Sequence, residues 1–441
     1  MYNDRLADFV VYFMSARLIL LGSLNLVRKL FTYTGDSDIN HNLRFALIES
    51  AFLGIIFTAD PFVSVFLVRN GASSFQVSLL SSMPAISGLI LVMFIGRFLQ
   101  SRKNILPWYS FPRIFSVSAY FFTGLAAFFF HDQALTLIVL VIWGLATVPQ
   151  TIIMVGFTVV MEIVADSRHR FELMSRRWAV MAGISALLLG GIGVFLDLVP
   201  SPLNYQIVFM TLSLAVIGST TFALKLKLPD NEPSDHMASV PINQQLKQYR
   251  VLLKDNPPFT RFILKRLFYH FGWTMAFPLY TIYFVRVVHA SDTWIGIFNT
   301  ASTILVVVGY FFWLKQSRKR DNRVLLGWTT FGIALFPILI GATVRVEIIA
   351  LVIGLGALFQ AGMDLVFFDE LMKTVPRKSN IIYISIAQSA QYLATIAGPF
   401  VGSFLADQFG LVTALMISGV VRLIGFGLFM SAKRESAPAD N

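Results

Sequence analysis

The sequence predicts an all-α polytopic membrane protein whose twelve transmembrane helices form two pseudo-symmetric six-helix bundles. Composition is the first reason: of 441 residues, 56% are hydrophobic, only 13% are charged and 42 are phenylalanine. A soluble domain of this size has no use for so much apolar surface. The second reason is that the apolar residues form long runs separated by short polar turns. The third is an internal repeat.

The repeat joins two pairs of short stretches that lie about 217 positions apart. Ala59–Arg69 corresponds to Ala276–Arg286, and Gln100–Lys103 corresponds to Gln316–Lys319. Parallel repeats of this kind are typical of transporters, in which substrate sites lie near the membrane midplane between the repeats. The chain is therefore expected to consist of two homologous halves.

Residues 1–42 precede the first predicted span. Residues 9–31 are apolar but carry Arg17 near their middle. No small-residue cleavage site follows, so we do not expect a removed signal peptide. We favour an interfacial helix on the cytosolic face over an additional span.

Twelve apolar runs then follow in order. We place the spans near 44–69, 76–99, 107–130, 135–160, 178–199, 206–227, 262–287, 294–315, 323–345, 348–372, 381–406 and 411–431. The domain boundaries predicted from them are 43–227 for the first bundle, 228–260 for a polar linker, 261–432 for the second bundle and 433–441 for a tail. The linker is punctuated by proline, and its residues 244–255 are suited to a short surface helix.

Lysine and arginine gather in the turns on one side of the predicted membrane, together with the linker and the tail. Arg176 and Arg177 are counted among these loop cations. By the positive-inside rule this side is cytosolic, so both termini are expected in the cytosol, at the plasma (inner) membrane of a prokaryote. The net charge of +11 belongs to these turns and does not indicate nucleic-acid binding. The chain has no cysteine, which excludes disulfides and thiolate chemistry.

Asp60 is the candidate proton-coupling residue. It lies inside the first predicted span, where an ionisable side chain is costly and usually faces a partner or a water-filled cavity. Pro61 follows it and removes one backbone hydrogen bond from the helix. Phe277 stands at the repeat-related position, so the fold of the second half does not need the acid. The structural alternative is a hydrogen-bonded acid that stabilises the proline kink.

Seven further polar or aromatic residues inside predicted spans are candidates for the walls of a central substrate cavity. Mid-span amides bind polar solutes, but they equally form hydrogen bonds between helices, and aromatic residues equally pack. His270 is also a candidate for proton relay, because histidine titrates near physiological pH. The seven are Gln150, His270, Trp273, Tyr280, Gln360, Gln388 and Gln391.

Four charged residues inside spans require partners. Glu49 and Arg266 occupy repeat-related positions near the cytosolic ends of the first and seventh spans. They either form a gating ion pair between the bundles or are solvated separately. Asp364 and Arg422 lie at similar depth in the tenth and twelfth spans. An unpaired arginine there would cost at least a few kcal/mol, so we expect a structural ion pair between these two residues.

A basic turn follows the second span of each half. With six plus six spans and a long central loop, these turns make residues 43–432 resemble the major facilitator superfamily. In that family the glycine of the turn is followed by an acid, where this chain has Gln100. The resemblance implies two bundles that alternate around a central site and assigns gating to the turns. The residues that carry it are Gly96, Arg102, Lys103, Gly309, Arg318 and Lys319.

These patterns indicate a secondary active transporter that works by alternating access and is coupled to protons through Asp60. Efflux of a lipophilic or cationic compound is favoured, and the amides suit a neutral polar solute instead. The rival hypothesis is a non-transporting protein of the same fold that serves as an assembly factor or subunit of a membrane complex. No P-loop, zinc-binding or Ser-His-Asp pattern is present, so we expect no enzyme, cofactor or metal. The expected partners are a small-molecule substrate, protons and lipid, and a monomer is favoured.

Overall fold

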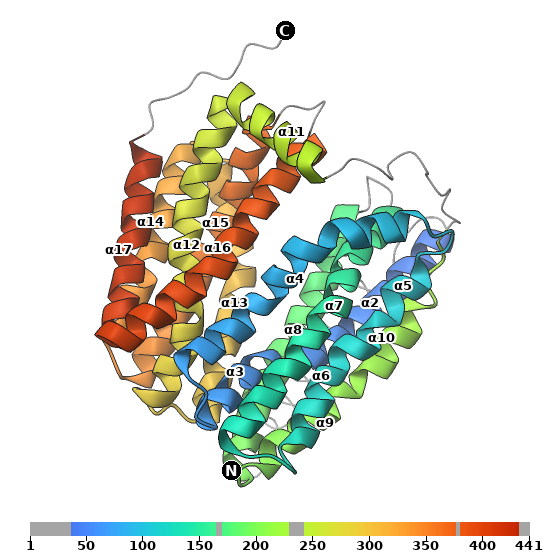
Figure 1. Cartoon of the computed structure of the whole chain (residues 1–441), viewed down its shortest axis with the longest axis vertical. Helices are drawn as coiled ribbons and strands as arrows, with labels where there is room; N and C mark the ends of the chain where they lie inside the picture. Colours follow the sequence, from blue (N-terminus) through green and yellow to red (C-terminus); the bar gives the residue numbers. More distant parts are fainter. Residues whose placement is uncertain (1–36, 165–169, 229–241, 376–379, 432–441) are drawn as a thin grey trace, which may run out of the picture.

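The computed structural model describes residues 37–164, 170–228, 242–375 and 380–431. The interfacial helix predicted at residues 9–31 and the predicted tail lie outside these residues. Every described element is helical, and the helices form two bundles side by side (Figure 1).

The first bundle contains six membrane-crossing segments, three of which are divided into two helices. In chain order its helices are α2 (Ser37–Phe57), α3 (Asp60–Arg69), α4 (Ser74–Gln100), α5 (Leu106–Ser110), α6 (Pro112–Ala126), α7 (Asp132–Val164), α8 (Arg170–Leu198), α9 (Leu203–Ser213) and α10 (Ala215–Ala223).

The second bundle also contains six segments, each a single helix, preceded by the short surface helix predicted from the linker. The linker helix is α11 (Ile242–Asp255), whose Leu252 and Leu253 pack against the bundle core. The six segments are α12 (Pro257–Arg286), α13 (Asp292–Ser317), α14 (Asn322–Gly341), α15 (Val346–Thr374), α16 (Asn380–Phe409) and α17 (Leu411–Met430).

Ten segments of the described chain are long and apolar enough to cross a membrane, which confirms the polytopic all-α class. The two bundle segments that do not meet this standard are α12 and α16, the seventh and eleventh of the twelve predicted spans. Both carry polar side chains along their length, including His270 on α12 and Gln388 and Gln391 on α16. These two helices pack against each other, so polar groups are concentrated along one seam of the second bundle.

Proline causes the interruption of the first span. Pro61 lies in the first turn of α3, where its missing N–H has no partner to lose, and the chain between α2 and α3 makes a tight turn. Thr58 donates its hydroxyl to the carbonyl oxygen of Gly54 at 2.7 Å, which satisfies one backbone group beside the break. The predicted kink at Asp60 is therefore present as a two-residue interruption, Thr58 and Ala59, between α2 and α3.

The bundles touch along one part of their length. We call the end at which α10 ends and α12 begins the linker end, and the opposite end the far end. In Figure 1 the ribbons lie close together toward the far end and diverge toward the linker end. Contact is made by α8 with α13 and by α4 with α16. Between α8 and α13, a Cβ on Gly296 would lie only 2.5 Å from the carbonyl oxygen of Leu189, so small residues permit this approach.

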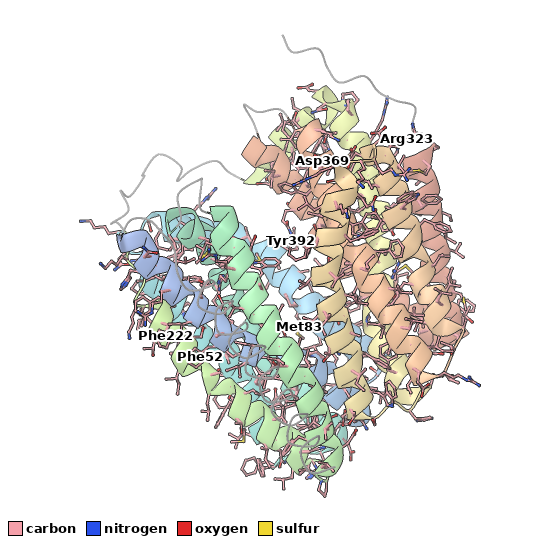
Figure 2. All side chains as sticks on the ribbon, turned by 180° about the vertical axis from the view of Figure 1, so that it is seen from behind. Phe52, Met83, Phe222, Arg323, Asp369 and Tyr392 are labelled. Carbon is pink, nitrogen blue, oxygen red and sulfur yellow. The ribbon has the colours of Figure 1, made fainter. Side chains whose placement is uncertain are left out.

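Hydrogen bonds between α4 and α16 use a carbonyl that a proline releases. Pro399 in α16 has no N–H to offer the carbonyl of Thr395, and Ser82 of α4 donates to that oxygen at 3.4 Å. Ser78 donates to the carbonyl oxygen of Pro399 at 2.9 Å. Toward the middle of the molecule Tyr392 points at the first bundle (Figure 2), with its hydroxyl 3.7 Å from the Sδ of Met154.

Candidate substrate and coupling site

Asp60 begins α3 directly after the break in the first span. Tyr120 of α6 donates its hydroxyl to the Asp60 carboxylate, and no other described residue forms a hydrogen bond with this side chain. Asp60 itself is exposed, whereas Tyr120 is buried. A carboxylate at a helix N-terminus is favoured by the helix dipole. The site thus holds an accessible acid with one protein donor, which leaves acceptor capacity for a proton or a ligand.

Tyr120 is held in position by aromatic packing. Its ring meets the Trp143 ring edge-on with 4.9 Å between centroids, and the Trp143 Nε1 donates to the hydroxyl of Thr123 at 3.1 Å. No sequence pattern points to Tyr120 in particular. The only available signal was a tyrosine within the third span, and in a chain with 13 tyrosines that signal is weak.

The predicted ion pair between Glu49 and Arg266 is wrong. Glu49 is fully buried inside the first bundle, where Arg177 donates to both carboxylate oxygens at 2.7 and 3.0 Å and Arg113 donates to one of them. These three residues tie α2, α6 and α8 together. Glu49 is fully buried whereas Asp60 is exposed, so the two acids do not line one cavity face. Arg177, taken as a loop cation, is buried with 5% exposure.

The predicted ion pair between Asp364 and Arg422 is also wrong. Arg422 is fully buried and donates to the carbonyl oxygens of Gly272 and Ile333 at 3.2 and 3.1 Å. The Ile333 carbonyl is available because Pro337, four residues later, has no N–H. Arg422 also donates to the carbonyl of Trp273 and to the hydroxyl of Tyr280. Backbone oxygens therefore satisfy this guanidinium without a carboxylate from the described residues.

Asp364 has neighbours of its own. Gln360 donates to its Oδ1 at 2.8 Å, and the Tyr310 hydroxyl lies 3.5 Å from its Oδ2. Asp364 is exposed, so it does not depend on a buried counter-charge.

Arg266 and His270 line a small pocket between α12 and α16, together with Gln391. Arg266 donates to the amide oxygen of Gln391 at 3.2 Å, and His270 lies 3.3 Å from the hydroxyl of Thr395. No carboxylate of the described ranges lies within ion-pair distance of Arg266. The structure thus brings three predicted site residues together in a small pocket whose other lining side chains are apolar.

Aromatic residues predicted to line the cavity follow Arg266 and His270 along α12. The rings of His270 and Trp273 stack with 5.2 Å between centroids, and Trp273 contacts Phe277. Tyr280 is instead tied to Arg422 and packs on Phe336. Gln150 and Gln388 are exposed on α7 and α16 and stay apart from this pocket.

The basic turns lie at the linker end, each with its own bundle. Arg102 stacks on the rings of Phe98 and Trp108, at 4.3 and 5.2 Å from their centroids. The side chains of Lys103, Arg318 and Lys319 are exposed. A gating role for these turns stays a prediction.

The two glycines of the basic turns differ in their surroundings. A Cβ on Gly96 would meet nothing within 4 Å, whereas one on Gly309 would lie 2.9 Å from the Leu358 carbonyl oxygen. Close packing between α13 and α15 thus explains Gly309. Within the described ranges, no three His, Asp or Glu side chains are grouped so that they could hold a metal ion.

Comparisons with known proteins agree with this architecture. Residues 262–441 match the family model of the Major Facilitator Superfamily. No curated protein matches the chain.

Among solved structures, the chain is similar to a bacterial homolog of the human lysosomal transporter Spinster in an inward-facing, unoccupied conformation. That likeness has 12% identity and a TM-score of 0.67, and it covers 90% of this chain and 97% of the other. A bacterial metal transporter (14% identity, TM-score 0.63, covering 90% and 99%) and the nucleoside transporter NupG (11%, 0.65, 90% and 99%) are also similar. The family match lies in the second bundle, and the solved structures share the fold of the whole two-bundle architecture.

Proposed function

We propose that this transporter moves a small molecule with a cationic group and couples its passage to protons through Asp60. The observation that carries the proposal is an accessible carboxylate at a helix break in the first span, with Tyr120 as its one donor among the residues that the structure describes. A carboxylate in this setting accepts either a proton or a cationic ligand. Competition between the two would couple their movements.

Two further features support a cavity between the bundles. The α12 row of Arg266, His270 and Trp273 supplies donors and a flat aromatic surface on the second bundle. Aromatic faces attract organic cations, so Trp273 and the exposed Phe277 suit a lipophilic cation. Binding at the midplane between repeats is typical of transporters of this architecture.

The arrangement of the bundles supports alternating access. They touch toward the far end and diverge toward the linker end, and lysine and arginine gather near the linker end. The positive-inside rule makes that end cytosolic, so in this conformation the bundles are apart on the cytosolic side, as alternating access requires of an inward-facing state. We propose the plasma membrane of a prokaryote as the location, with the linker and both termini in the cytosol.

The test is transport by purified protein in proteoliposomes, with tetraphenylphosphonium as the probe cation. The wild type is expected to accumulate the probe against its gradient when a pH difference is imposed, and Asp60→Asn is expected to abolish accumulation while keeping normal folding. Tyr120→Phe, which removes only the donor, is the matched control and should weaken the pH dependence without abolishing it. Accumulation by Asp60→Asn at the wild-type level would refute proton coupling at this residue.

A further inference from the structure

The far-end loops after the first and seventh spans have the same construction. Gly71 and His289 both adopt positive φ angles, of 81° and 53°. Each is followed by an alanine and then by the serine that caps the next helix, Ser73 for α4 and Ser291 for α13. The internal repeat therefore extends to the backbone of these loops.

The arginine that ends each of these spans reaches the loop of the opposite bundle. Arg69 of the first bundle donates to the carbonyl oxygen of Ala290 at 3.2 Å. Arg286 of the second bundle donates to the carbonyl oxygen of Ala72. Because Arg69 and Arg286 are repeat-related, and the two alanines follow the positive-φ residues, the contacts form a reciprocal exchange between the halves.

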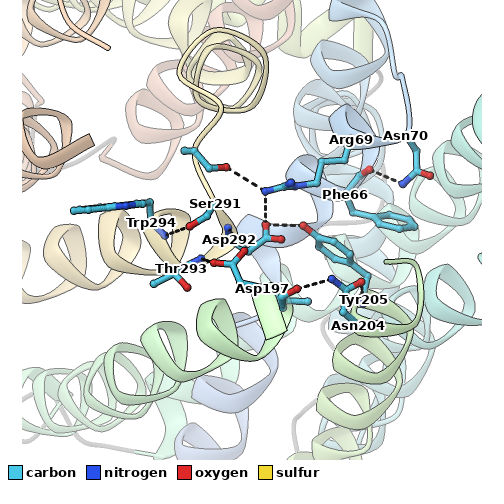
Figure 3. Close-up of polar contacts among 12 residues, drawn as sticks. Phe66, Arg69, Asn70, Asp197, Asn204, Tyr205, Ser291, Asp292, Thr293 and Trp294 are labelled. Carbon is cyan, nitrogen blue, oxygen red and sulfur yellow. Dashed lines mark hydrogen bonds and ion pairs between the residues drawn. The ribbon is translucent and has the colours of Figure 1, made fainter. Parts of the chain in front are cut away.

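The carboxylate of Asp292 adds an ion pair to the contact made by Arg69 (Figure 3). Arg69 also donates to its Oδ1 at 3.0 Å, and the hydroxyl of Tyr205 donates to the same oxygen at 2.6 Å. Asp197 of α8 accepts from the backbone N–H groups of Asp292 and Thr293, each at 2.8 Å, and so caps the N-terminus of α13.

Every side-chain contact of the Asp292 carboxylate is thus made with the first bundle. Asp292 is buried with 3% exposure. Separating the bundles at the far end would remove both donors from this carboxylate and the Asp197 cap from α13. Charge-assisted hydrogen bonds of this kind are the stronger ones in proteins.

We propose that Arg69, Arg286, Asp197 and Asp292 form a clasp that closes the far end, and that breaking it is the step that opens the cavity to the opposite side of the membrane. The proposal rests on the alternating-access function proposed above. The contacts of Arg69 and Arg286 are related by the sequence repeat. Within the described residues, only Arg69 also pairs with a carboxylate, that of Asp292, so the contacts of Arg69 are the stronger ones. Arg69 is therefore expected to matter more than Arg286.

Pulsed electron paramagnetic resonance on the cysteine-free chain tests the clasp. Spin labels at the exposed positions His131 and Gln408 report the far-end separation, and labels at Ser101 and Ser317 report the linker end. Arg69→Gln should raise the population with a long far-end distance by about tenfold, and Arg286→Gln by less. Arg345→Gln, which removes an exposed far-end arginine outside the clasp, is the matched control and should change nothing.

Arg69→Lys should restore part of the wild-type distribution, because it keeps the charge beside Asp292. One outcome is a wild type with two far-end distances whose populations stay the same in Arg69→Gln. That result would overturn the clasp but not the proposed function. One fixed far-end distance in the wild type and in every variant would contradict alternating access itself, and with it the proposed function. A variant that unfolds would lose the linker-end distance as well, which separates misfolding from opening.

Discussion

The two bundles give different environments to charges at repeat-related positions. In the first bundle Glu49 is fully buried and is held by two arginines, whereas its counterpart Arg266 lines a pocket with one amide partner. Eleven residues further along, Asp60 of the first bundle corresponds to the exposed Phe277 of the second. The duplicated sequence thus supplies a fixed internal cluster and a titratable acid in one half. In the other half it supplies a cation that has no carboxylate partner among the described residues, and an aromatic face.

The bundles also satisfy their buried arginines differently. Arg113 and Arg177 share the carboxylate of Glu49, while Arg422 is surrounded by carbonyl oxygens, one of them released by Pro337. A shared carboxylate neutralises charge, whereas carbonyls only replace the hydrogen bonds that water would supply. Equivalent folds therefore do not require equivalent electrostatics, and the two solutions predict different responses to mutation.

The largest expected effect is on Glu49. Glu49→Gln should lower the free energy of unfolding by about 3–5 kcal/mol, because it leaves two buried guanidinium groups without their counter-charge. Thermal unfolding in detergent measures this loss. Arg266→Gln, at the repeat-related position, is the control and should lower stability much less, because Arg266 is only half-buried and has no carboxylate partner among the described residues. Equal losses in the two variants would remove the contrast between the bundles.

Arg422 gives the next effect. Arg422→Gln should cost about 1–3 kcal/mol, because it leaves the Ile333 carbonyl, which Pro337 releases, without a donor. Asp364→Asn should have little effect, since Asp364 is exposed and bonded to Gln360. The double variant should show the sum of the single losses. Recovery of stability in the double variant would instead show that the two charges neutralise each other.

The smallest effects concern the glycines of the basic turns. Gly309→Ala should destabilise the second bundle by about 1–3 kcal/mol, because the new methyl group meets the Leu358 carbonyl oxygen. Gly96→Ala has open space around it and should raise helix stability by about 0.5–1 kcal/mol. Thermal unfolding of the two variants shows whether the two glycines differ in their packing, as their surroundings predict. Similar losses for both would contradict the difference in packing around the two glycines.

Hydropathy and the repeat predicted the class, the twelve segments and the short linker helix, because these depend on patterns that are local along the chain. The break at Asp60 was also predictable, since Pro61 acts on its own backbone. The partners of Glu49 and Arg422 were not predictable. Depth along a helix says how far a charge lies from the membrane surface, but it does not say which neighbouring helix the charge faces.

The wrong predictions for Arg177 and Arg422 show that the packing of the helices was the missing information. Arg177 was counted with the loop cations because it lies at the beginning of a span, yet α8 turns it inward to Glu49. Arg422 was given a carboxylate partner because a buried charge was assumed to need one. That the carbonyl oxygens of Gly272, Trp273 and Ile333, the last of them released by Pro337, lie around Arg422 is visible only once the helices are placed together.

The pH dependence of cation binding tests the central claim, that Asp60 is the acid at which proton and substrate compete. Binding of tetraphenylphosphonium to purified protein would be measured by calorimetry across a pH series. Because the carboxylate binds the cation and the protonated acid does not, the wild-type Kd should fall as the pH rises. The change should approach about tenfold per pH unit where the acid is mostly protonated. Asp60→Asn should bind weakly with a flat profile; a wild-type slope that survives in Asp60→Asn would contradict the account.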